Sequence, residues 1–130
     1  MKLMVGYDGS NSSKEALRLA KSHAEAFNAN VHVVHSMESG TETEREDIDT
    51  MEKELAWAKS YFEKEAIKCD THLLIRGLAP GEDLVAFAKD RGIDAIFVGI
   101  KRRSRIGKIL MGSNAQYVIL KAPCPVVSVK

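Results

Sequence analysis

Short apolar runs and stretches with helical spacing alternate along the whole chain. The apolar runs are rich in β-branched residues and have the length of buried strands, and they lie at residues 3–7, 31–35, 69–75, 95–98 and 126–129. Between these runs, apolar positions recur every three or four residues, as they do on one face of an amphipathic helix. Because strands that alternate with helices form parallel sheets, the pattern predicts an α/β fold with helices on both faces of the sheet.

The first two predicted helices differ in length. The first begins at Ser12, which precedes Glu15 at the spacing of a capping box, and it ends at residues 28–30. The second follows a polar and acidic loop, residues 37–50, and continues to about Lys68. Its apolar positions predict one buried face, made up of Ile48, Met51, Leu55, Ala58, Phe62 and Ala66.

The last two predicted helices lie in the second half of the chain. Pro80 is expected in the first turn of the third helix, and Gly92 is expected to end that helix. The fourth helix spans residues 112–120, and Pro123 and Pro125 prevent it from continuing into the terminal strand.

The segment that joins the fourth strand to the last helix carries the strongest functional signal. The strand ends at Gly99, a cationic stretch follows at residues 101–108, and Gly112-Ser113-Asn114 opens the helix. The start of a helix offers unpaired N–H groups and a partial positive charge, and it therefore attracts anions. The segment thus predicts a phosphate site and hence a nucleotide-binding domain. The alternative is that Ser113 or Asn114 only caps the helix.

Asp8, Ser36 and Gly99 each lie just past the carboxyl end of a predicted strand. In open parallel sheets, ligands bind beyond these ends, where the strand order reverses, so we expect the three residues to converge on one crevice. Asp8 has two interpretations. Together with Gly9 it has the chemistry of a tight turn, or its carboxylate accepts hydrogen bonds from a ribose or from an adenine amino group.

Composition and charge restrict the classes of function. The 130 residues are predicted to form one domain, residues 1–130, and they are 45% hydrophobic and 28% charged, as in soluble globular proteins. The formal net charge of +1 gives no overall attraction to nucleic acid or to a membrane, so the cationic stretch suits a small anionic ligand. No apolar run approaches the roughly 20 residues that a membrane span needs.

The cysteines and histidines give no sign of a metal site or of a catalytic site. Cys69 and Cys124 lie far apart and form no paired motif, which favours reduced thiols in a cytoplasmic protein. The four histidines show no spacing typical of metal ligands. No nucleophile motif and no pair of catalytic carboxylates stands out, so we expect no catalytic residue and no metal ligand among the side chains.

Several segments resemble the universal stress protein family. They are residues 5–10 (Val-Gly-Tyr-Asp-Gly-Ser), Val98-Gly99, Gly112-Ser113-Asn114 and the ending Ala-Pro-Cys-Pro-Val-Val-Ser-Val at residues 122–129. The family's nucleotide motif is Gly-x2-Gly-x9-Gly followed by Ser or Thr, and Gly99 and Gly112 match its first and third glycines. The resemblance extends over the whole length of the chain.

The resemblance implies both a fold and an assembly. The fold is a three-layer α/β sandwich, Rossmann-like and similar to the adenine nucleotide alpha hydrolases, whose five-stranded parallel sheet has the order 3-2-1-4-5. The assembly is a cytoplasmic homodimer in which the terminal strands, residues 126–129, pair in antiparallel fashion and so protect an apolar edge. Some members of the family bind ATP or AMP, whereas others bind no nucleotide.

Transferred residue by residue, the resemblance implies a nucleotide site made up of Tyr7, Asp8, Ser36, Val98, Gly99, Arg102, Gly112, Ser113, Asn114 and Ala115. Asp8 is expected at the ribose or the adenine, and Ser36 is expected at the adenine. Gly99 is expected to admit the ribose-phosphate, and residues 112–115 are expected to hold the phosphates. We expect Mg²⁺ or Mn²⁺ to accompany the phosphates, since such ions bridge phosphate oxygens with few protein ligands.

Arg102 departs from the family motif, because it stands where the family has its second glycine. A side chain at that position narrows the approach of the backbone and disfavours positive φ. The chemistry of Arg102 leaves three alternatives: it blocks the phosphates, it points outward, or its guanidinium group binds a phosphate. Because Asp8 is retained, together with Gly99, Gly112 and Ser113, we expect nucleotide binding to be retained as well.

The sequence therefore predicts a stress-response protein that binds an adenine nucleotide, ATP or AMP, as a sensor or switch in a homodimer. Binding is expected to order the loop at residues 100–111 and to change the surface that a protein partner meets. One alternative is an interaction module of the same fold that binds no nucleotide. A second is a slow ATPase, since a triphosphate beside cations is partly activated, although no residue stands out as a base that would position water.

Overall fold

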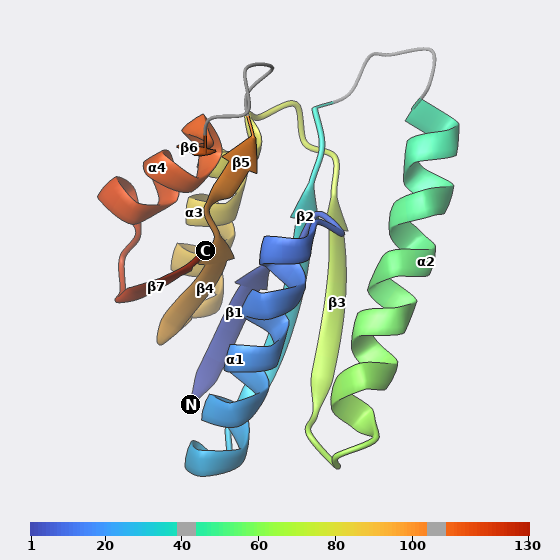
Figure 1. The fold of residues 1–130 in the computed structure, drawn as a ribbon, viewed down its shortest axis with the longest axis vertical. Coiled ribbons are helices and arrows are strands. Elements are labelled where there is room, and N and C mark those ends of the chain that lie inside the picture. The colour runs from blue at the N-terminus through green and yellow to red at the C-terminus, as the bar shows by residue number, and fades with distance from the viewer. Residues whose placement is uncertain (39–43, 104–108) are drawn as a thin grey trace.

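A five-stranded parallel sheet forms the centre of the computed structural model, which describes residues 1–38, 44–103 and 109–130 (Figure 1). The strand order is β3-β2-β1-β4-β7. The strands are β1 (Lys2–Gly6), β2 (Asn30–Ser36), β3 (Cys69–Leu74), β4 (Ala95–Gly99) and β7 (Val126–Val129). Counted over the five strands that the sequence predicts, this is the order 3-2-1-4-5, and that prediction is confirmed.

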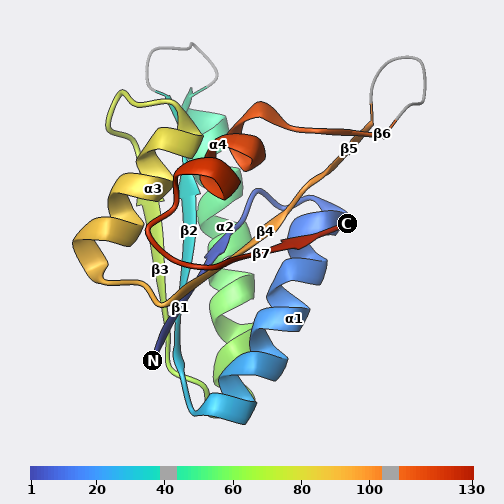
Figure 2. The same ribbon diagram turned by 90° about the vertical axis from the view of Figure 1, so that its left-hand side faces the viewer.

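Helices cover both faces of the sheet and complete the three predicted layers (Figure 1, Figure 2). One face carries α1 (Asn11–Phe27) and α2 (Glu44–Glu63), and the other carries α3 (Pro80–Arg91) and α4 (Ser113–Lys121). Each helix buries part of its apolar surface in one of the two cores, and this burial stabilises helices that would be marginal in isolation. Within the described residues, no helix combines the length and the apolar character needed to cross a membrane.

Successive residues of the central strands enter two separate hydrophobic cores. Leu3 and Val5 of β1 are buried in the core under α1 and α2, whereas Met4 between them is buried in the core under α3 and α4. Because both faces of the sheet are covered, its inner strands are apolar at consecutive positions instead of alternating between apolar and polar residues. The sheet is therefore buried on both faces, and its carboxyl edge carries the loops that the sequence assigns to a ligand.

The start of α1 differs from the prediction. Ser10, and not Ser12, is the N-cap: its backbone is extended, with φ −69° and ψ 161°, and its Oγ accepts the N–H of Ser13 at 3.2 Å. Ser12 is instead buried inside the first turn. The end of the helix agrees with the prediction, since Asn28 adopts the left-handed conformation (φ 52°) that terminates helices.

The second helix is also placed differently from the prediction. It already includes Glu44, inside the predicted loop, and it ends at Glu63 instead of near Lys68. The chain leaves the helix because Ala66 adopts a left-handed φ of 58°, after which Ile67 returns to the core. Of the predicted apolar face, the buried residues are Met51, Leu55, Ala58 and Phe62.

The chain between β4 and α4 forms an antiparallel hairpin that the sequence did not predict. Its strands are β5 (Lys101–Arg103) and β6 (Ile109–Met111), and Arg102 lies opposite Leu110. The hairpin stands away from the rest of the molecule, as Figure 2 shows. Residues 104–108 of the predicted loop lie outside the described part of the chain.

Candidate functional site

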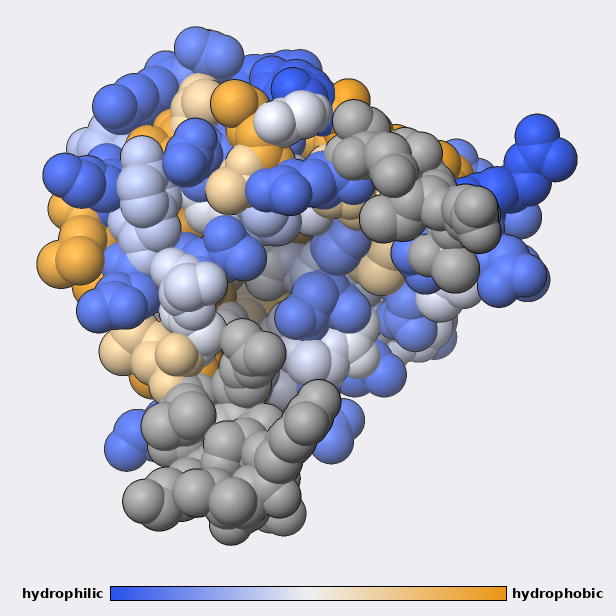
Figure 3. All heavy atoms as spheres, turned by 90° about the horizontal axis from the view of Figure 1, so that it is seen from above, coloured by the Kyte–Doolittle hydropathy of each residue, from blue (hydrophilic) through white to orange (hydrophobic). Residues whose placement is uncertain are grey.

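A pocket of about 500 Å³ lies at the carboxyl ends of the parallel strands. It sits where the strand order reverses, with β2 and β3 on one side of β1 and with β4 and β7 on the other. This is the place where open α/β sheets bind their ligands, and the volume is within the range of about 300–1,000 Å³ that is common for small-molecule sites. Figure 3 looks onto this end of the molecule and shows a recess bordered by hydrophilic residues.

The pocket brings together most of the residues that the sequence assigns to a nucleotide site. Those that line it are Tyr7, Asp8, Ser36, Val98, Gly99, Gly112, Ser113, Asn114 and Ala115. They come from the ends of three strands and from the start of α4, so residues distant in sequence meet as expected. The backbone of Arg102 belongs to β5, and its side chain lies outside the described part of the structure. The roles of all these residues toward a ligand stay predictions.

Gly99 is required by the packing of α1. A β-carbon at this position would lie 2.5 Å from the carbonyl carbon of Ser12 and 2.7 Å from the backbone nitrogen of Ser13. These are backbone atoms, which cannot move aside as a flexible side chain would. Because Gly99 has no side chain, the first turn of α1 can pack closely against the end of β4. The predicted contact of Gly99 with a ribose-phosphate is untested.

Gly112 has a different environment from Gly99. It is the N-cap of α4 with φ −68° and ψ 148°, a conformation open to any residue. A β-carbon here would meet no atom within 4 Å in the described part of the molecule. Among the described side chains, none caps the helix start through a hydrogen bond. The fold thus does not require a glycine at this position, and the N–H groups of the first turn of α4 border a pocket with room for an acceptor.

Asn114 does not cap its own helix, because it bonds to the neighbouring one. Its Oδ1 accepts the backbone N–H of Gly81 at 2.8 Å, at the start of α3. A β-carbon on Gly81 would lie 3.0 Å from the carbonyl oxygen of Asn114, so the two helix starts are in close contact. Neither Ser113 nor Asn114 serves as a side-chain cap of α4, and that alternative from the sequence is wrong.

Asp8 forms the turn that its sequence predicts. Its Oδ1 accepts the backbone N–H of Ser10 at 2.9 Å, and Gly9 between them has a φ of 82°. Burial acts to raise the pKa of the Asp8 carboxyl, but hydrogen bonds from Ser10 and Ser13 and the nearby His35 outweigh it and lower that pKa. The carboxylate therefore stays charged at the rim of the pocket, and its predicted contact with a ligand is untested.

Tyr7 lines the pocket, but its polar atoms already form hydrogen bonds within the chain. It therefore helps to determine the shape of the pocket. Its hydroxyl donates to Glu54 Oε2 at 2.7 Å, and its carbonyl oxygen lies 2.8 Å from Nδ1 of His35. Its backbone N–H donates to the carbonyl oxygen of Val34. Burial and the hydrogen bond to Glu54 both raise the pKa of the Tyr7 hydroxyl, which therefore stays protonated.

Two polar residues behind the pocket wall were missed by the sequence analysis. Asp83, in the first turn of α3, is fully buried and accepts a hydrogen bond from the hydroxyl of Ser36 at 2.6 Å. Arg76, which follows β3, donates from Nε to the other carboxylate oxygen at 2.7 Å and forms an ion pair with it. A buried charge needs such a partner, but no spacing in the sequence indicates one.

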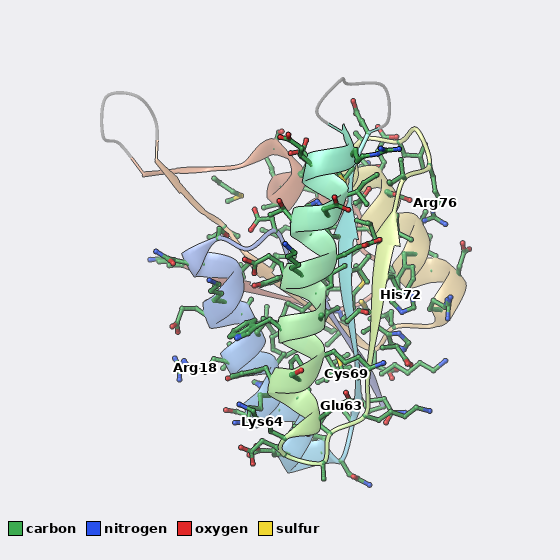
Figure 4. The ribbon with its side chains drawn as sticks, turned by 90° about the vertical axis from the view of Figure 1, so that its right-hand side faces the viewer. Arg18, Glu63, Lys64, Cys69, His72 and Arg76 are labelled. Carbon is green, nitrogen blue, oxygen red and sulfur yellow. The ribbon has the colours of Figure 1, made fainter. Side chains whose placement is uncertain are left out.

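A second polar cluster lies between β2, β3 and α3, outside the pocket lining. His32 Nδ1 and His72 Nε2 are 3.0 Å apart, and Phe87 packs against both rings. Figure 4 shows His72 on the side of β3 that faces α3. Burial is the main cause that lowers the pKa of both histidines. In the residues that the structure describes, no group of three or more His, Cys, Asp or Glu side chains is placed to hold a metal ion.

Comparison with known proteins gives a consistent result over the full length of the chain. The model of the universal stress protein family matches residues 1–130. A universal stress protein of Methanocaldococcus jannaschii is 31% identical over 140 aligned residues, which cover 99% of this chain and 81% of that protein.

Solved structures show the same similarity in three dimensions. A universal stress protein of Archaeoglobus fulgidus superposes with a TM-score of 0.90 at 40% identity, over 100% of this chain and 98% of the other. A structure of the universal stress protein from the same organism in complex with dAMP superposes with a TM-score of 0.84 at 38% identity, over 100% and 98% of the two chains.

Proposed function

Because the chain belongs to the universal stress protein family, we propose that it binds an adenine nucleotide, ATP or AMP, in the pocket at the carboxyl edge of its sheet. In this proposal the nucleotide acts as the signal of a cytoplasmic stress-response switch. The base lies toward Ser36, the ribose lies toward Asp8, and the phosphates lie at the start of α4. The complex of the Archaeoglobus fulgidus protein with dAMP supports an adenine nucleotide as the ligand.

The open start of α4 is the observation that carries this proposal. The N–H groups of its first turn have no side-chain cap, and the space beside Gly112 is free of the atoms that the structure describes. The packing of the fold does not require a glycine at this position. A phosphate that approaches the backbone closely does require a residue without a side chain. The helix dipole adds a favourable field for an anion at the same place.

Two further parts of the proposal concern Arg102 and a metal ion. The backbone of Arg102 belongs to the projecting hairpin, which supports the alternative that its side chain leaves the phosphates accessible. A Mg²⁺ or Mn²⁺ ion would arrive with the phosphates and neutralise part of their charge. Such an ion would bridge phosphate oxygens and would need few protein ligands.

We also propose a homodimer that forms through β7. This strand pairs with β4 on one side, and no described strand pairs with its other side. The valines of this strand, Val126, Val127 and Val129, are only partly buried. An open apolar edge strand has unpaired backbone N–H and C=O groups that can pair with a second strand. Pairing of two β7 strands across a twofold axis satisfies these groups in both chains. Sedimentation analysis tests this, since a dimer has twice the mass of one chain and a monomer contradicts the proposal.

Isothermal titration calorimetry with ATP and with AMP tests nucleotide binding directly. We expect saturable binding of both nucleotides by the full-length chain. Absence of binding at millimolar concentrations of either nucleotide would contradict the proposal and favour an interaction module of the same fold. Arg102 is the residue that favours this second candidate, so the variant Arg102→Gly belongs in the same experiment. A gain of binding in that variant alone shows that the arginine closes the site.

A further inference from the structure

The hydroxyl of Ser36 is held in one orientation by a residue behind the pocket wall. Ser36 lies at the carboxyl end of β2, lines the pocket and donates its proton to Asp83 Oδ2. The oxygen–oxygen distance of 2.6 Å is that of a strong hydrogen bond to a charged acceptor. Asp83 has no exposed surface, so water does not compete for this bond.

Arg76 determines the direction of this hydrogen bond. Its guanidinium group donates to Oδ1 of Asp83 at 2.7 Å and forms an ion pair with the same carboxyl group (Figure 4 shows Arg76 just beyond the end of β3). A carboxylate only accepts hydrogen bonds, so the single proton of Ser36 must point toward Asp83. Within the described residues, no group donates to Ser36 Oγ, so its lone pairs remain available as acceptors.

From this geometry we infer that Ser36 is a specificity-determining residue, which presents a hydrogen-bond acceptor to the base of the nucleotide. The inference rests on the proposed function and adds the base selectivity of the site. Adenine carries an exocyclic amino group, which donates to such an acceptor. Hypoxanthine and guanine carry a carbonyl oxygen at the same ring position, which would face the lone pairs of Ser36 with no proton between the two oxygens.

The size of the expected preference follows from the cost of an unpaired buried acceptor. Loss of one such hydrogen bond lowers affinity by about tenfold, and sites built around a polar group of the ligand often discriminate more strongly. Asp83 and Arg76 act only through Ser36, so they are positioning residues and do not touch the ligand.

The variant Asp83→Asn reverses the donor and acceptor of the hydrogen bond to Ser36. Arg76 still donates to the amide oxygen, which takes the place of Oδ1, so the amide N–H group faces Ser36. The hydroxyl then accepts from the amide and turns its own proton into the pocket. We expect this variant to bind inosine monophosphate more tightly than adenosine monophosphate. If the role of Asp83 were purely structural, the variant would bind both nucleotides more weakly and would still bind adenosine monophosphate more tightly than inosine monophosphate.

Calorimetric titration with adenosine monophosphate and inosine monophosphate tests the inference on the full-length chain. The wild type should prefer the adenine nucleotide by about tenfold, and Ser36→Ala should reduce this preference to about one. Ser113→Ala is the matched control, because it removes a hydroxyl from the phosphate end of the same pocket. It should weaken both ligands equally and leave the preference unchanged. Circular dichroism shows whether each variant is folded.

The outcomes separate this inference from the proposed function. If neither nucleotide binds to the wild type, the proposed function and the inference fail together. If both bind equally, or if Ser36→Ala keeps the preference, the inference alone is overturned and another group reads the base. If Asp83→Asn does not fold, the pair of Ser36→Ala and Ser113→Ala still decides between these outcomes.

Discussion

The helices α1 and α4 both begin at the pocket, but their first turns differ in what they leave unsatisfied. At the start of α1, Ser10 Oγ accepts the N–H of Ser13, and the Ser13 hydroxyl donates back to the carbonyl oxygen of Ser10 at 2.9 Å. At the start of α4, Gly112 has no side chain that could cap the helix. Both helices have the same dipole, so the dipole alone does not make a site. The difference teaches that an anion site needs donors that the chain has not already used.

The glycines at these two places repeat the contrast. Gly99 is needed because the backbone of α1 lies against it, whereas the position of Gly112 is open in the described part of the fold. Gly99 is therefore needed for the stability of the fold, whereas Gly112 is available for ligand binding. Substitutions at the two helix starts test this division.

The largest effect is expected from Gly99→Ala. The added β-carbon would overlap the backbone of Ser12 and Ser13, so α1 or β4 must shift. We expect a loss of about 3 kcal/mol in the free energy of unfolding, measured by urea denaturation. Gly112→Ala is the control, and we expect it to change stability much less. Equal losses in the two variants would contradict the assignment of Gly99 to packing.

The next largest effect is expected from giving α4 the cap that it lacks. Gly112→Asp should cap the first turn, raise stability by a few tenths of a kcal/mol and place a negative charge where phosphates are proposed to bind. We expect nucleotide affinity to fall by about ten- to a hundredfold in calorimetric titrations. Gly112→Asn caps equally well without the charge, so it should lose less affinity. Unchanged affinity in Gly112→Asp would place the phosphates elsewhere.

A smaller effect is expected when α1 loses its cap. Ser10→Ala leaves the N–H of Ser13 without its side-chain acceptor, which costs about 1 kcal/mol of stability. Thermal unfolding followed by circular dichroism measures this loss. We expect the affinity for nucleotide to change little, because the phosphates are proposed to lie at the start of α4 and not at the start of α1. A loss of affinity larger than the loss of stability would mean that both helix starts contact the ligand.

The smallest effect concerns the charge of Asp8 beside the start of α1. Its pKa is lower in the folded protein than in the unfolded chain, so the charged carboxylate stabilises the fold above the unfolded pKa of about 3.8. This contribution is lost as the pH falls through the lower folded pKa. We therefore expect Asp8→Asn to lower the melting temperature slightly at pH 6 and to match the wild type once the pH is below the folded pKa of Asp8. A difference that persists in acid would indicate lost turn geometry instead of lost charge.

The sheet was predictable from sequence because its inner strands are buried on both faces. Consecutive apolar residues such as Val33 and Val34 enter opposite cores, and that pattern stands out in a chain with 28% charged residues. Residues 101–103 are all charged, so nothing in their composition indicates β5. Ser12 satisfied the capping-box spacing, but the turn at Asp8 starts the helix two residues earlier, at Ser10.

The candidate site was only partly predictable for a related reason. Residues that follow strands, such as Asp8 and Ser36, were found because parallel strands bring their carboxyl ends together. Asp83 was not found, since 47 positions separate it from Ser36 and only the packing of α3 on the sheet joins them. Contacts of this kind depend on how helices lie across the sheet, which no local pattern records.

The bond between Asn114 and Gly81 has a mechanical consequence. It fastens the start of α4 to the start of α3, and the two helices touch so closely that a methyl group on Gly81 would strain the contact. α3 and α4 should therefore move as one rigid body. Any widening of the crevice on ligand entry or release is expected to separate this pair from α1, across the edge of the sheet.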